Sequence, residues 1–317
     1  MKNKITDIAK MLKISPATVS RVFNKHPYVN EDIRKRVLET ARKVNYAPKS
    51  NSNKNTFGIM VSGTDGISIS TPYETQLVFS ISKMLFNEGF AVQIFSFQSI
   101  PYLHSNSVRA LIVLSSVIPD ELLQVGFPVV SVNNPHEKTY SVFTDHAEGA
   151  RMAVDYLAGK GHKRIAFISG KSNCWGNTER ENGYREGVRK NSLDVEDALL
   201  KKADNEKLLE AIACIMKEEP TALIVAGEGK GLVVNHSLYL LDKRIPDDIS
   251  IITYEDNIIS PYLQPPHTTI SQNLDILGAK AAEMAIAAAN EGKYDAPFSV
   301  SLENTIIERS SVKNILP

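Results

Sequence analysis

Apolar residues recur at a helical spacing in three short stretches within the first fifty positions of the chain. The first stretch covers residues 7–12, and Thr6 stands where a capping side chain is expected. The third stretch covers residues 30–44. The inward-facing side chains are expected to be Ile8, Ala9, Met11 and Leu12 in the first stretch and Ile33, Val37, Leu38 and Ala41 in the third.

The second stretch is predicted to be a helix that Ser15 caps. Pro16 suits its first position, because the missing N–H has no helical partner there. Val19, Val22 and Phe23 would be buried. The outward side chains would be Ala17, Thr18, Ser20 and Arg21. Two short helices joined by a tight turn, with a third that completes the core, predict a helix-turn-helix unit.

From residue 57 onward, short continuous apolar runs alternate with amphipathic stretches. The runs predict strands at 57–62, 91–97, 110–115, 128–132, 164–169, 222–226 and 250–254. The stretches predict helices at 73–87, 147–160, 180–191, 205–218, 230–241 and 275–291. Such alternation is typical of parallel sheets covered on both faces. A crossing near residue 145 and a return near 270 predict two lobes with a ligand cleft between them.

The run KSNSNKNT at residues 49–56 contains no apolar residue and separates these two regions. Its Asn- and Ser-rich composition favours a flexible tether over a helix. The predicted organisation is therefore an all-α headpiece at 1–48, a polar linker at 49–56 and an α/β two-lobed body at 57–317.

The net charge of zero conceals an asymmetry between these regions. Residues 1–54 hold 13 Lys and Arg against 4 Asp and Glu, whereas the rest of the chain holds 23 against 32. A basic headpiece on an acidic body indicates a polyanionic partner, although a solvated basic face is the alternative. Two cysteines, Cys174 and Cys214, are too few for a disulfide framework or a zinc cluster, and no apolar run is long enough for a membrane span. We therefore expect a cytoplasmic protein that uses no metal or other cofactor.

The segment ITDIAKMLKISPATVSRVFNKHPYVNEDIRKRVLETARKVNYAP, with its run T-V-S-R-V-x-N, resembles the DNA-binding headpiece of the LacI/GalR family of bacterial transcription regulators. The resemblance implies double-stranded DNA with a near-palindromic operator as partner. Arg21 would make a forked contact to guanine, while short polar side chains would contact phosphates. Each could instead be a cap or a solvated surface residue. The implied DNA-binding set is Thr6, Ser15, Pro16, Ala17, Thr18, Ser20, Arg21, Asn24, Tyr28, Val29, Asn30 and Tyr46.

The remainder of the chain is similar to the body of the same family in GARMAVDYLAGKGHKRIAFISG, PTALIVAGEGKGL, IPDDISIITYED and PPHTTI. This resemblance implies a periplasmic-binding-protein-like fold, a homodimer and a small effector in the cleft. The predicted role is a repressor of a carbohydrate-utilisation operon. The alternatives are a regulator that responds to a non-sugar effector and a cytoplasmic solute-binding protein. An enzyme is not expected, because the seven histidines form no ligand pair and no phosphate loop or nucleophile elbow occurs.

The family's cleft arginine falls on Arg180, which could fork onto ligand oxygens or instead pair with a neighbouring acid. Tyr73 and Trp175 offer aromatic faces to a ligand, or else serve packing. Two positions depart from the common pattern. Gly227, followed by Glu228, replaces the Asn of A-N-D, and Glu255 replaces the Asp of Y-D-D. A hydroxyl-rich ligand and a different effector both remain open.

Two segments are shorter than in the family. Between Gly89 and Ala110 there is room for one strand and a polar loop, but not for a further full helix. The linker lacks the leucine that wedges into the minor groove in A-R-x-L hinge helices. We therefore predict that the hinge helix is absent or rudimentary.

Overall fold

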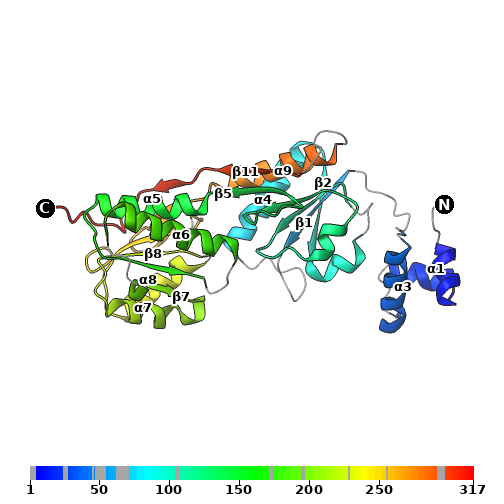
Figure 1. Ribbon diagram of the computed structural model, residues 1–317, viewed down its shortest axis with the longest axis horizontal. Helices are drawn as coiled ribbons and strands as arrows, with labels where there is room; N and C mark the ends of the chain where they lie inside the picture. Colours follow the sequence, from blue (N-terminus) through cyan, green and yellow to red (C-terminus); the bar gives the residue numbers. More distant parts are fainter. Residues whose placement is uncertain are drawn as a thin grey trace.

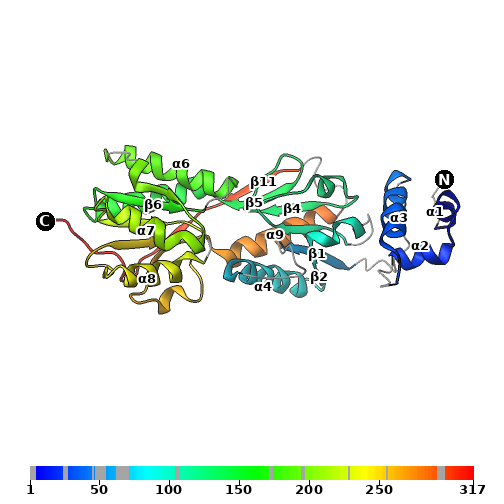
Figure 2. The same cartoon turned by 90° about the horizontal axis from the view of Figure 1, so that it is seen from below.

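The computed structural model describes residues 5–23, 28–44, 46, 55–61, 71–103, 108–170, 174–193, 197–227, 229–254, 256–290 and 297–317. Three helices form a separate unit near the N-terminus, and two sheets with their helices form an elongated body (Figures 1 and 2). The hinge prediction for residues 49–54 lies outside the described residues.

The headpiece consists of α1 (Ile5–Leu12), α2 (Pro16–Phe23) and α3 (Glu31–Lys43). A small core joins them, with Ile8, Ala9, Val19, Val22, Val37, Leu38 and Ala41 buried. Two details of the prediction are wrong. The helix α1 begins at Ile5, so Thr6 lies inside its first turn and is no cap, and Met11 points outward with 60% of its surface exposed. A core of this size leaves room for only part of the apolar stripe.

The body contains two six-stranded sheets of matching order. Lobe 1 has the order β11-β5-β4-β3-β1-β2, and all of its neighbouring strands are parallel. Its strands are β1 (Thr56–Val61), β2 (Ala91–Ser96), β3 (Leu111–Leu114), β4 (Val129–Val132), β5 (Tyr140–Thr144) and β11 (Ser299–Leu302). Lobe 2 has the order β12-β10-β9-β8-β6-β7, and of these described strands only β12 runs antiparallel to its neighbour. Its strands are β6 (Ile165–Ser169), β7 (Leu200–Lys202), β8 (Ala222–Val225), β9 (Ser250–Thr253), β10 (Thr268–Ser271) and β12 (Thr305–Ile307).

The two faces of the lobe 1 sheet are covered differently. The helices α4 (Pro72–Asn87) and α9 (Leu274–Ala289) pack together over one face. In the described part of the chain, the other face is covered by 3-10 turns, η1 (Phe97–Tyr102) and η2 (Asp120–Gln124). This arrangement confirms, for these residues, that a full helix does not follow β2.

Lobe 2 carries two helices on each face of its sheet. α5 (His146–Gly159) and α6 (Trp175–Lys190) cover one face, and α7 (Leu208–Met216) and α8 (Lys230–Leu240) cover the other. Gly183 allows α6 to approach α5 closely, since a Cβ there would lie 2.0 Å from the carbonyl oxygen of Ala147. The described residues of lobe 2 also form the 3-10 turns η3 (Asp197–Leu199), η4 (Asn205–Lys207) and η5 (Ser260–Tyr262).

The chain crosses between the lobes three times, from β5 to α5, from β10 to α9 and from β11 to β12. The first two crossings confirm the predicted ones near 145 and 270. The third was not predicted, nor were β5, β7, β10, β11 and β12, because these strands are short or mix polar with apolar residues. The crossings are joined to one another, since Asn273 Nδ2 donates to Glu303 O at 3.3 Å and Asn304 Nδ2 donates to Asp145 O.

Candidate functional site

The exposed face of α2 carries the side chains that the sequence predicts for DNA contact. Ser15 Oγ accepts from Thr18 N at 3.0 Å, which confirms the cap. Burial of Val19 and Val22 fixes the opposite face against the core, so Pro16, Ala17 and Arg21 are exposed. An exposed arginine on such a helix can reach the major groove and donate to two acceptors of one guanine.

The other predicted DNA-binding residues are distributed around this helix. Tyr28, 90% exposed, and Asn30 lie on the surface, and Asn30 Oδ1 also accepts from Asp32 N at 2.8 Å at the start of α3. Val29 and Tyr46 instead pack against the headpiece core, with the Tyr46 ring 5.6 Å from that of Phe23. Thr6 is exposed on α1, Ser20 is half-buried, and Asn24 lies outside the described residues.

A cavity of about 630 Å³ lies between the lobes. The carboxyl ends of β3, β4, β6, β8 and β9 contribute to its wall, together with the first residues of α4, α5, α6, α8 and α9. Parallel strands of two facing sheets bring their loops to one place, and the N-terminal ends of helices add N–H groups there. This is where an α/β body of two lobes is expected to hold a ligand.

Four of the six predicted effector residues line this cavity, namely Tyr73, Trp175, Arg180 and Gly227. Glu228 and Glu255 lie outside the described residues. The helix α6 begins at Trp175 and not near residue 180, so Trp175 and Arg180 lie in its first two turns and face the same cavity.

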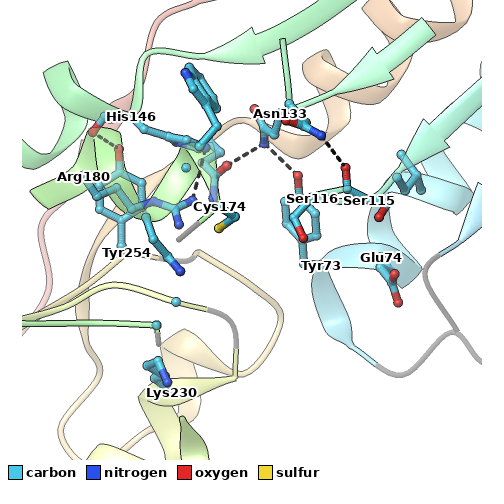
Figure 3. A pocket seen from close by; sticks show the side chains of 18 of the residues that line it. Tyr73, Glu74, Ser115, Ser116, Asn133, His146, Cys174, Arg180, Lys230 and Tyr254 are labelled. Atoms are coloured by element: carbon cyan, nitrogen blue, oxygen red, sulfur yellow. Dashed lines mark hydrogen bonds between the residues drawn. The ribbon is translucent and has the colours of Figure 1, made fainter. Parts of the chain in front are cut away.

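An aromatic cluster forms the lobe 2 wall (Figure 3). The Arg180 guanidinium carbon lies 4.6 Å from the ring centre of Tyr254, and Arg180 Nη2 donates to His146 Nε2 at 3.3 Å. Trp175 lies 5.2 Å from the His146 ring and 5.1 Å from the Phe143 ring. Within the described residues, the buried Nε of Arg180 has no hydrogen-bond partner. Arg180 thus contacts a ring face and an imidazole, and its Nε can donate to a ligand.

His146 is neutral in this arrangement. Burial, and then the charge of Arg180, hold the pKa of His146 well below its ordinary value. An arginine can only donate, so Nε2 must be the unprotonated nitrogen. The proton on Nδ1 then faces Thr144 Oγ1 at 3.4 Å. Tyr254 Oη donates to His146 O at 2.9 Å, and burial raises the pKa of Tyr254, so this tyrosine is a donor at neutral pH.

Gly227 and Lys230 form a second part of the lobe 2 wall. Gly227 has φ +129°, and a Cβ there would lie 2.6 Å from Lys230 Cε. Lys230 is buried and donates through Nζ to Ala203 O at 2.8 Å and Asn205 Oδ1 at 3.2 Å. The absent side chain at Gly227 thus makes room for a lysine stem that fixes the segment after β7 at the edge of the cavity.

Several lining residues were not predicted from the sequence. They are Asn133, His146, Lys230, Tyr254, Asp256 and Gln272. Each stands within a few residues of a strand end or at a helix start, and that position is the signal that could have identified them. Asp256 is paired with Arg309 at 2.7 Å, so its charge is already compensated.

The described residues hold no group of three or more side chains suited to a metal ion, and none of their helices is long and apolar enough to pass through a membrane.

Comparison with known proteins gives consistent matches. Residues 4–49 match the family model described as bacterial regulatory proteins, lacI family, and residues 154–312 match the periplasmic binding protein-like domain. The chain is 27% identical over 341 residues to the HTH-type transcriptional repressor PurR of Photobacterium profundum, covering 98% of this chain and 99% of that protein.

Solved structures of similar fold were also found. The transcriptional regulator CelR-cellobiose complex superimposes with a TM-score of 0.74 at 23% identity, over 98% of this chain and 99% of the other. The lac repressor dimer bound to operator and the anti-inducer ONPF superimposes with a TM-score of 0.71 at 20% identity, over 99% and 100%. At these identities the structures are evidence of the shared fold.

Proposed function

Since the chain belongs to the LacI family of bacterial regulatory proteins and carries a periplasmic binding protein-like body, we propose that it represses transcription as a homodimer. Its affinity for a near-palindromic operator would depend on a small molecule bound in the cavity. The observation that carries this proposal is the joint presence of the α2 surface with Arg21 and the interlobe cavity with Arg180. The relatives are repressors and not enzymes, so no catalytic residue or cofactor is assigned. Binding to operator DNA would take place in the cytoplasm.

The proposed division is a headpiece at 1–48, a linker at 49–56 and a body at 57–317. Limited proteolysis of the free protein tests it, because proteases cut the connection between two folded units before they cut the units themselves. Cleavage confined to residues 49–55, with both fragments resistant, is the expected pattern, because Thr56 is buried as the first residue of β1.

Selection of sequences from a random duplex pool tests the DNA-binding role directly. The full-length chain at low salt should enrich a palindrome, because a two-fold symmetric dimer presents two copies of α2. Substitution of Arg21 by Ala should relax one base position and lower specific affinity by about 1–3 kcal/mol. Lys13→Ala is the matched control, since loss of an exposed lysine weakens binding to all sequences alike. Selection of no sequence by the wild-type chain would count against the proposal.

We propose a sugar or similar polyhydroxylated molecule as the effector. The aromatic rings of Trp175 and Tyr73 suit the C–H faces of a sugar, and the cavity volume of about 630 Å³ exceeds that of a single pyranose. Cellobiose is bound to the similar CelR protein, so it is the first probe. Ribose is bound to a similar LacI family regulator from Enterococcus faecium, so it is the second. Calorimetry with the full chain should detect binding that Arg180→Lys weakens about tenfold or more, because lysine lacks the planar fork. Binding that is equal in both proteins would exclude Arg180 from the site.

The dimer interface is proposed on one long side of the body. Figure 2 shows α4 of lobe 1 and α8 of lobe 2 along the same side. Exposed apolar side chains occur on α4 at Phe79 and Phe86, on α8 at Leu232 and Tyr239, and in or near η5 at Ile258 and Tyr262. A series of this kind exceeds the scattered apolar residues of a monomer surface. Tyr239→Lys should shift the sedimentation of the protein toward the monomer, whereas Leu209→Lys on α7 should not.

A further inference from the structure

One side chain on the lobe 1 wall joins three separate segments of the body. Asn133 follows β4 and lines the cavity. Its amide contacts Tyr73 at the start of α4, Thr144 at the first crossing and Gln272 at the second crossing. We call these four residues the Asn133 node.

The orientation of each amide in the Asn133 node follows from one backbone donor. Thr144 N can only donate, and it lies 2.9 Å from Asn133 Oδ1, so this atom is the oxygen. Asn133 Nδ2 therefore donates, to Tyr73 Oη at 2.7 Å and to Gln272 Oε1 at 2.8 Å. Thr144 Oγ1 lies 3.4 Å from both Asn133 Oδ1 and Gln272 Oε1. Both Asn133 donors and its oxygen are thus engaged.

The backbone at Asn133 is matched to this role. Its φ of +51° lies in the left-handed region, which costs about 1 kcal/mol or more for a residue with a Cβ and which Asn tolerates better than most. Such a conformation persists only where the surroundings hold it. Here the holding groups are the hydrogen bonds to the two crossings and to α4.

Gln272 provides the contact with the cavity. It is 6% exposed, and its Oε1 accepts from Asn133, so its Nε2 must point elsewhere. No acceptor for Nε2 lies among the described residues, and Gln272 lines the cavity. A hydroxyl or carbonyl oxygen of a ligand can therefore accept from this Nε2, and Gln272 would then move with the ligand.

We propose that Asn133 is the positioning residue that transmits occupancy of the cavity to the angle between the lobes, by holding Tyr73 of lobe 1 to both crossings. A ligand that contacts Gln272 or Tyr73 would change the hydrogen bonds of the Asn133 node. The helix α4 and the crossings would then change position together. This inference rests on the proposed function, but the role of Asn133 in holding the lobes can be tested without a ligand.

The distance between the lobes tests the inference without a ligand. One spin label is placed on native Cys214 of α7, which is exposed, and a second on the cysteine that Glu88→Cys introduces at the end of α4. With Cys174→Ser in the background, pulsed electron resonance reports the distance between the labels, and dilution with unlabelled chains isolates the distance within one protomer. Asn133→Asp removes both donors but keeps the acceptor for Thr144 N, and Asn133→Gly keeps the left-handed backbone without adding a charge. Both should shift or widen the distribution by roughly 2 Å or more.

A matched control separates this effect from general loosening. Asn191→Asp also removes two amide donor contacts, to Asp155 Oδ1 at 2.6 Å and Gly187 O at 2.9 Å, but all three residues belong to lobe 2. Its distribution should equal that of the wild type. Tyr73→Phe should widen the distribution, and adding it to Asn133→Gly should produce no further change, because the glycine has already removed the partner of Tyr73 Oη.

Operator affinity provides the second readout. Asn133→Asp should weaken binding to the selected operator about fivefold, since fewer molecules hold the DNA-competent arrangement, whereas Asn191→Asp should stay within twofold. Distance distributions of Asn133→Asp and Asn133→Gly that both superimpose on the wild type would overturn the inference. If the wild-type chain selects no operator, the proposed function fails, while the distance measurement still decides the role of Asn133.

Discussion

The two lobes share a strand order but differ in what covers their sheets. Lobe 2 has helices on both faces, whereas the described part of lobe 1 has helices on one face and 3-10 turns on the other. Lobe 2 also supplies most of the large side chains of the cavity, namely Trp175, Arg180, Lys230 and Tyr254, whereas lobe 1 supplies Tyr73. We infer that lobe 2 is the rigid side of the cavity and lobe 1 the compliant side, because stability follows the density of buried contacts.

Glycines between paired helices allow the sharpest test of this difference. In lobe 2, a Cβ at Gly183 would lie 2.0 Å from the backbone oxygen of Ala147, whereas in lobe 1 a Cβ at Gly278 would meet the Ser80 side chain at 2.8 Å. Gly183→Ala should therefore lower the free energy of unfolding by roughly 4 kcal/mol and Gly278→Ala by about 2 kcal/mol, measured by urea denaturation. Gly159→Ala, which meets nothing within 4 Å, should stay within about 1 kcal/mol of the wild type. Equal losses at Gly183 and Gly278 would remove the distinction between the lobes.

Acid should act on lobe 2 first. The buried histidines of the described residues, His146, His162 and His267, all belong to lobe 2. Burial, and then Arg309, lower the pKa of His267 from 6.5 to about 4. Between pH 6.5 and about pH 4, His267 is protonated in the unfolded chain but not in the folded chain. The free energy of unfolding is therefore highest above pH 6.5, as far as His267 is concerned. It decreases by roughly 3 kcal/mol as the pH falls toward 4.

Hydrogen exchange at about pH 7.5 and about pH 5 can assign that loss to a lobe. At the lower pH, amides of lobe 2 should lose more protection than those of lobe 1. His267→Gln should reduce this pH dependence. Glutamine retains an N–H donor for Asn235 Oδ1, which lies 3.1 Å from Nε2 of the native His267. An unchanged pH dependence in this variant would show that His267 titrates normally.

The sequence predicted the architecture well and the cavity only in part. Periodicity sufficed for α2 and for the long apolar strands, because burial of one face or of both dictates these patterns. The short strands β5 and β11 were missed, and with them the third crossing, because partly exposed residues such as Tyr140 and Ser299 carry no clear pattern.

The site illustrates the same limit. Arg180 is predicted from the family resemblance and Trp175 from its aromatic character. His146 and Asn133 are not predicted, because their roles depend on contacts between distant segments. From the sequence, the departure at Gly227 indicates only the loss of an amide side chain. Its structural consequence, the space taken by Lys230, depends on a positive φ that no single residue in the sequence reveals.

Cavity-forming substitutions test the thin cover of lobe 1 against the thick cover of lobe 2. Leu122 of η2 and Ile212 of α7 are both fully buried, on corresponding faces of the two sheets. Leu122→Ala should cost about 2 kcal/mol and Ile212→Ala about 4 kcal/mol, because a 3-10 turn can collapse into the space and a packed helix pair cannot. Denaturant titration of both variants checks this difference. A greater loss for Leu122→Ala would mean that the 3-10 cover is as rigid as the helices.

The smallest expected effect concerns the edge of lobe 1 where the linker enters β1. The Arg109 guanidinium carbon lies 5.8 Å from the ring centre of Phe57 and 5.2 Å from that of Phe90, and its Nη2 donates to Asn290 Oδ1 at 2.8 Å. Because Phe57 belongs to β1, this arginine braces the strand against the end of α9 on the side that has helices. Arg109→Lys should cost about 1 kcal/mol by denaturation, since an ammonium keeps the charge but loses the flat contact with both rings.

Arg109 also allows the difference between the lobes to be tested through operator binding. If lobe 1 is the compliant side, loosening the β1 edge should also weaken operator binding, by about twofold to fivefold, because the linker is anchored there. Lys160 of lobe 2 offers the matched control, since its Nζ lies 5.1 Å from the Tyr156 ring centre, far along the chain from the headpiece. Lys160→Gln should cost about 1 kcal/mol or less in stability and leave operator affinity unchanged. Equal effects of both variants on the operator would show that the headpiece responds to overall stability and not to the lobe 1 edge.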